Sequence, residues 1–131
     1  MKKYHFIEHT GDLGIEVFGK TLSSLFRNAG EAFTDIITDP DTIQPRISKQ
    51  ISLNADRVED LLVHWLNEFI FLFDAEELLF SIFDIDSIDE SHIEASVRGE
   101  AYAADRHAIK TPVKSATYHQ LEVGRENNGW K

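Results

Sequence analysis

Two long stretches of the chain repeat apolar residues at the period of an α-helix. The first follows Thr21, a residue type that can cap a helix, and ends before Asp39 and Pro40. The second follows Asp56, which stands three residues before Glu59 in the spacing of a capping box. The pattern therefore predicts two amphipathic helices, with apolar stripes formed by Leu22, Leu25, Phe26, Ala29, Ala32, Phe33, Ile36 and Ile37 in the first and by Val58, Leu61, Leu62, Trp65, Leu66, Phe69, Ile70 and Phe73 in the second.

The second predicted helix is apolar almost all round in its last turns, because Phe71 and Leu72 add to the stripe. Such a helix end is either buried from several sides or covered by a partner. An exposed aromatic patch on a monomer promotes aggregation, so we expect burial.

Alternating apolar and polar residues predict strands on both sides of the helices, at residues 3–7, 15–18, 47–53, 78–85, 93–97 and 113–123. The stretch 78–85 is apolar on both faces, which is typical of a central strand. Asn127-Asn128-Gly129 is a hairpin signal just before Lys131, which leaves no return strand in the sequence. Either the chain ends frayed or a C-terminal strand is missing, and we expect that it is missing. The strands do not alternate regularly with the helices, which predicts a single α+β domain over residues 1–131, with mostly antiparallel sheet and the two helices packed on it.

Composition narrows the class of protein. The 131 residues include no cysteine, which excludes disulfides, thiolate metal sites and cysteine nucleophiles and fits a reducing compartment. The longest apolar run, residues 69–73, is far shorter than the roughly 20 residues of a membrane-spanning helix. No apolar stretch follows Lys2 and Lys3 as in a signal peptide, so we expect a cytoplasmic protein without a membrane segment.

The segment His9-Thr10-Gly11-Asp12-Leu13-Gly14 is the richest in chemistry. Glycine on either side of Asp12 allows a tight turn, and a carboxylate there can ligate a hard cation. Such a cation needs several oxygen ligands, so distant segments would have to supply the others. The alternative is that Asp12 only caps N–H groups of the turn.

A second group of candidates gathers positive charge near the C-terminus. Arg106, His107, Lys110 and Lys114 follow one another closely, and they can dock an acidic partner or a phosphate, or balance nearby carboxylates. In the predicted strand 113–123, Lys114 and Tyr118 share one face. His119 lies on the other face among apolar residues, where it is either a hydrogen-bonded core residue or a ligand.

These segments together resemble the archease family, small acidic proteins that assist the GTP-dependent tRNA-splicing ligase. The segment from His9 to Gly14 is similar to the family's His-Thr-Ala-Asp-Ile-Gly opening. The central helix and the strand after it are matched by Trp65-Leu66-Asn67-Glu68, Leu72-Phe73-Asp74 and Leu79-Phe80-Ser81. The family's C-terminal motif is matched by Arg106-His107, Lys110, Val113-Lys114 and Thr117-Tyr118-His119.

The resemblance covers nearly the whole chain and implies an archease-like fold and a non-enzymatic activator. Such an activator promotes guanylylation and turnover of the ligase and binds a divalent cation, for which we expect calcium. It implies that Asp12 is one metal ligand and that the others come from the C-terminal segment absent here. It also implies that Arg106, Lys110, Lys114, Tyr118 and His119 contact the ligase.

Two other functions fit the same residues. One is a chaperone-like binding module for an RNA-modifying enzyme, with no role for a metal. The other is a metal-dependent hydrolase in which Asp12 and His119 act on a bound water. The sequence leaves the oligomeric state open.

Net charge makes a prediction about nucleic acid. At −10, the isolated protein is repelled by phosphate backbones, and the cations around Lys110 are too few to reverse this. We therefore expect no appreciable binding to tRNA at physiological salt in a filter assay. Micromolar binding that weakens with added salt would contradict this prediction and favour direct delivery of RNA to the ligase.

Overall fold

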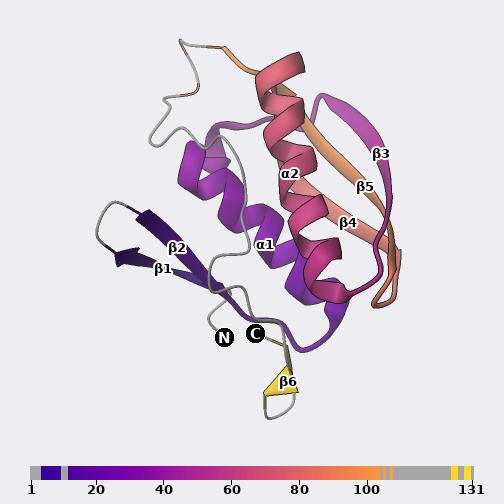
Figure 1. Ribbon diagram of the computed structural model, residues 1–131. Coiled ribbons are helices and arrows are strands. Elements are labelled where there is room, and N and C mark those ends of the chain that lie inside the picture. Colours follow the sequence, from indigo (N-terminus) through magenta and orange to yellow (C-terminus); the bar gives the residue numbers. More distant parts are fainter. Residues whose placement is uncertain are drawn as a thin grey trace.

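The chain folds into short strands and two long helices in an α+β order, as the hydrophobic pattern predicts (Figure 1). The computed structural model describes residues 4–9, 12–103, 105, 107, 125–126 and 129–130, with side chains described for residues 17–103, 105 and 107. The elements are β1 (Tyr4–His9), β2 (Asp12–Val17), α1 (Leu22–Ile37), the 3-10 turn η1 (Pro40–Thr42), β3 (Ile47–Asn54), α2 (Val58–Glu76), β4 (Leu78–Ile88), β5 (His92–Ala101), β6 (Arg125–Glu126) and β7 (Gly129–Trp130). No helix formed by these residues has the length and apolar character needed to cross a membrane.

The main sheet is antiparallel and has the strand order β3-β5-β4, with both helices in front of the sheet in Figure 1. The expectation that residues 78–85 form a central strand is wrong for this sheet, because β5 lies in the centre and β4 lies at an edge. Bulges in β4 explain the error. Phe80 and Phe83 are three residues apart, yet they pair with Gly99 and Val97 and so share one face, because the register shifts between Phe80 and Ile82.

Helix α1 begins where the sequence predicts. Thr21 is its N-cap, and the threonine hydroxyl accepts a hydrogen bond from the backbone N–H of Ser24 at 3.1 Å. The buried face of the helix packs against β4, and Gly30 allows the close approach, since a Cβ there would lie 2.8 Å from the Phe83 ring. A buried bond from the Thr34 hydroxyl to the Phe80 carbonyl, 2.7 Å long, fixes the helix on the strand.

Helix α2 begins one residue later than the capping-box spacing predicts. Its N-cap is Arg57, which makes no side-chain capping bond, so the prediction for Asp56 is wrong. Arg57 instead lies 3.8 Å from Glu59 and 3.4 Å from Asp60 in the first turn, where acidic residues interact favourably with the helix dipole. The helix ends at Glu77, which adopts the left-handed conformation.

The apolar end of α2 is buried only in part. Leu72 is buried, but Phe71 is 56% exposed, so the expectation of burial is wrong at Phe71. Leu66, on the predicted stripe, is half-buried and packs against the core. Phe73 is likewise partly buried against the core, and the other stripe residues form one continuous core with the inner face of the sheet.

Two hairpins complete the described chain. β1 and β2 pair with His9 opposite Asp12, so the strand already includes Asp12 and the turn is shorter than the predicted segment from His9 to Gly14. β6 and β7 pair with Arg125 opposite Trp130, so the expected hairpin does have a short return strand. The predicted strand 113–123 lies outside the described residues.

The core and the exposed aromatic make a matched pair for mutation. Phe26 is fully buried and its ring lies 6.2 Å from that of Trp65, so Phe26→Ala should destabilise the fold by about 3–5 kcal/mol. Phe71→Ala removes the same atoms from an exposed position and should change stability by less than about 0.5 kcal/mol. Urea denaturation of both variants measures the difference. An equal loss at both positions would show that Phe71 is covered in solution.

Candidate functional site

Asp12 is positioned by the first hairpin. Backbone pairing with His9 places it at the first residue of β2, at the turn end of the hairpin, and both strands contact α1. Figure 1 shows the hairpin beside α1, on the side away from the main sheet. The structure thus fixes where the backbone of Asp12 lies, and its role as a metal ligand stays a prediction because its side chain is not described.

The residues predicted to contact a partner follow the end of β5. Arg106, Lys110, Lys114, Tyr118 and His119 lie outside the described residues. Their assignment therefore stays a prediction. The described chain reaches into this segment at Asp105 and His107.

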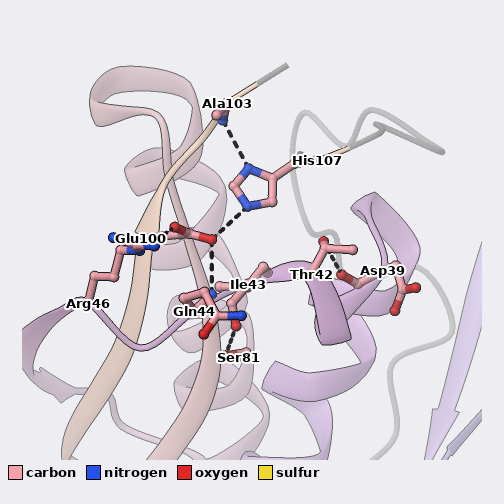
Figure 2. Close-up of polar contacts among 9 residues, drawn as sticks. All are labelled: Asp39, Thr42, Ile43, Gln44, Arg46, Ser81, Glu100, Ala103 and His107. Atoms are coloured by element: carbon pink, nitrogen blue, oxygen red, sulfur yellow. Dashed lines mark hydrogen bonds and ion pairs between the residues drawn. The ribbon is translucent and has the colours of Figure 1, made fainter. Parts of the chain in front are cut away.

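His107 departs from the sequence-based interpretation. The sequence groups it with the cations of a docking segment, whereas the structure buries it completely. Its Nε2 atom lies 2.9 Å from Oε2 of Glu100, which is 2% exposed (Figure 2). Glu100 belongs to β5, one residue before the end of that strand. The two side chains form a buried polar pair inside a mainly apolar fold.

The hydrogen bonds around His107 fix its tautomer. The backbone N–H of Ala103 lies 2.9 Å from Nδ1, and an N–H group can only donate, so Nδ1 accepts. In the neutral ring the hydrogen is therefore on Nε2, which donates to the Glu100 carboxylate. The backbone N–H of His107 in turn donates to the Ala103 carbonyl at 2.8 Å, which closes the turn between the two residues.

Glu100 also joins a third segment to the pair. Its Oε2 accepts a hydrogen bond from the backbone N–H of Gln44 at 2.9 Å, and Oε1 lies 3.2 Å from Nε of Arg46. Arg46 is 64% exposed, so the arginine approaches from solvent, whereas the bond from Gln44 is part-buried and the bond from His107 is buried. Figure 2 shows the carboxylate between the chain before β3 and the imidazole of His107. Buried charges are stable only when they are paired and hydrogen-bonded, and these partners meet that condition.

The neighbouring backbone is held to the end of α2. The N–H of Tyr102 donates to the Glu77 carbonyl at 2.7 Å, and the Tyr102 ring meets Phe73 edge-on at 5.9 Å. The same ring lies 6.1 Å from the imidazole of His107. The chain from Glu100 to His107 is thus attached to the start of β3 and to α2. We call Glu100, His107, Gln44, Arg46 and Ala103 the Glu100–His107 cluster.

Sequence reasoning missed this cluster for a physical reason. Its members come from three segments, and no periodic pattern brings residues 44, 100 and 107 together. The one local signal is a glutamate at the end of an apolar strand. Among the side chains that the structure describes, no three His, Asp or Glu residues gather to hold a metal ion. The cluster therefore has the character of a structural anchor.

Sequence comparison places the chain among known proteins. The sequence model of the Archease protein family matches residues 4–131. Protein archease of Methanosarcina acetivorans is 35% identical over 134 residues, which cover 99% of this chain and 92% of that protein. Protein archease of Saccharolobus islandicus is 37% identical over 132 residues, with 99% and 94% covered.

Solved structures agree in fold. The solution structure of protein 1598 from Methanobacterium thermoautotrophicum superposes with a TM-score of 0.82 at 28% identity and covers 99% of this chain and 94% of that one. The crystal structure of an archease from Thermotoga maritima, described as a possible chaperone, gives a TM-score of 0.62 at 19% identity, with 95% and 88% covered, and supports the fold alone. The chain therefore belongs to the archease family.

Proposed function

We propose that this protein is a non-enzymatic activator of a GTP-dependent tRNA-splicing ligase, promoting its guanylylation and turnover. The observation that carries the proposal is membership of the archease family across residues 4–131. That match includes the opening segment with Asp12 and the C-terminal segment from Arg106 to His119. The backbone of Asp12 lies at the turn end of the first hairpin, and this supports the proposal because a turn is a common place for a carboxylate that ligates a hard cation.

In the proposed function, two groups of residues have separate roles. Asp12 supplies oxygen ligands to a divalent cation, for which we propose calcium, together with ligands from the C-terminal segment. Arg106, Lys110, Lys114, Tyr118 and His119 contact the ligase near its guanylylation site. The cations suit this task because a chain of net charge −10 needs a local positive surface to approach an acidic one. On this proposal the protein acts in the cytoplasm.

A second candidate function is a chaperone-like binding module that needs no metal. The description of the Thermotoga maritima archease as a possible chaperone favours it. Both functions require a partner protein. They differ in whether removal of the metal or of the Asp12 charge abolishes the effect on that partner.

We expect Asp12→Asn to abolish stimulation of ligase guanylylation while leaving the fold intact. The amide keeps the size of the side chain and removes the charge that a hard cation requires. The measurement is ligase guanylylation with wild type and variant. Calorimetry with calcium should show tight binding by the wild type and weak binding by the variant.

Asp84→Asn is the matched control, since it removes the same charge from an exposed position on β4. It should stimulate as well as wild type. A chelator should abolish stimulation if the metal is required. Stimulation by Asp12→Asn equal to wild type would refute the metal role, and full activity in chelator would favour the chaperone-like module. Hydrolysis of phosphoester substrates by the isolated protein would identify a metal-dependent hydrolase.

A further inference from the structure

We propose that Glu100 and His107 are positioning residues for the partner-binding cations, an inference that rests on the proposed function. The pair fixes the position of His107, which lies within the basic segment of the sequence. Neither side chain is accessible to a partner, since Glu100 is 2% exposed and His107 is fully buried. Their effect on a partner must therefore act through the residues that follow.

The cluster is a fixed point because three separate segments meet there. Glu100 comes from the central strand β5, Gln44 from the chain before β3, and His107 from the chain after β5. The bonds of 2.9 Å from Gln44 and from His107 both end on the same carboxylate oxygen. Movement of His107 would break a buried charge-assisted hydrogen bond, which is about twice as strong as a neutral one.

Histidine satisfies both of its neighbours at once. Nδ1 accepts from the Ala103 N–H and Nε2 donates to Glu100, with both distances 2.9 Å. Glutamine can reproduce the donor at the position of Nε2 but not the acceptor. Asparagine can reproduce the acceptor at the position of Nδ1 but not the donor. The two substitutions therefore separate the bond that holds His107 to the sheet from the bond that closes its own turn.

The fixed point limits where the first cations can lie. Arg106 is the sequence neighbour of His107, and Lys110 follows three residues later. A peptide chain spans at most about 3.6 Å per residue, so the location of His107 bounds the reach of both cations. In a protein with 23 acidic and 13 basic residues, a displaced cation meets the protein's own carboxylates in place of the partner's. Positioning therefore raises affinity for an acidic surface without adding a contact.

The test compares four variants in the ligase guanylylation assay, with protein concentration varied to separate affinity from maximal rate. His107→Asn, which loses the donor to Glu100, should raise the half-activating concentration by about tenfold or more. His107→Gln, which keeps that donor, should raise it by less than about threefold. Both should reach the wild-type maximal rate at saturation, because the cations themselves remain.

Two further variants complete the set. Glu100→Gln keeps the shape of the carboxylate and removes its charge. Its half-activating concentration should lie between those of His107→Gln and His107→Asn. It takes the place of His107→Asn in the comparison if that variant does not fold. Lys49→Gln is the control, because it also removes one positive charge but lies outside the cluster, and its 3.6 Å contact with Glu76 is exposed on both sides, where ion pairs contribute little. It should behave as wild type. Urea denaturation confirms that each variant tested is folded.

Native-state trypsin digestion gives a readout that does not depend on the ligase. If the pair anchors the chain at His107, loss of the bond to Glu100 should increase local opening there, and cleavage after Arg106 and Lys110 should be faster in His107→Asn than in wild type by about fivefold or more. Cleavage after Arg27, in the middle of α1, should be unchanged and serves as the internal reference.

The outcomes separate the two proposals. If wild type stimulates the ligase and folded His107→Asn has the wild-type half-activating concentration, the positioning role is wrong and the proposed function stands. A lower maximal rate at saturation with unchanged half-activating concentration would also overturn it. If wild type does not stimulate the ligase, the proposed function fails, and faster cleavage after Arg106 would still support anchoring by the pair. Unchanged cleavage would overturn the anchoring.

Discussion

The buried indole of Trp65 is the contact on which the arrangement of the two helices depends. Its ring is fully buried, and its N–H donates to the backbone carbonyl of Phe26 at 2.9 Å. A buried indole N–H without a partner would be costly, so this bond ties α2 to one position along α1. The ring also meets Phe69 edge-on at 4.7 Å, and Phe69 meets Phe83 of β4 at 5.2 Å. One aromatic cluster thus joins both helices to the sheet.

The packing of the helices on the sheet also determines where the candidate site lies. Gly30 lets α1 approach the Phe83 ring, and Thr34 bonds to the Phe80 carbonyl, so β4 is fixed beneath the helix. Pairing between β4 and β5 then places Leu79 opposite Glu100. The carboxylate lies at this end of the sheet, where the chain before β3 and the chain after β5 also pass. The Glu100–His107 cluster is therefore a consequence of how the helices register on the sheet.

The sequence predicts the helices and strands that follow from a local hydrophobic period, and it misses the features that depend on contacts between distant segments. Both helices, the Thr21 cap and the strands 47–53 and 93–97 follow from periodicity and capping chemistry. The bulges of β4 break the two-residue period, so reading by alternation alone misplaces that strand. His107 was grouped with cations because its neighbours in the sequence are basic. Its burial depends on Glu100 and Gln44, which no pattern within a single segment can reveal.

The buried pair is informative because it is not what stability alone favours. A carboxylate in a protein interior loses its hydration, and well-packed apolar residues of similar size are often at least as stable as buried charged groups. An aromatic core that already joins the helices to the sheet does not require such a pair for cohesion. Hydrogen bonds are directional, so they stabilise one orientation of the chain over the others, which apolar packing alone does not do. On the proposed function, a segment that presents its cations to a partner benefits from that selectivity, and this links the Glu100–His107 cluster to the proposed function as well as to the fold.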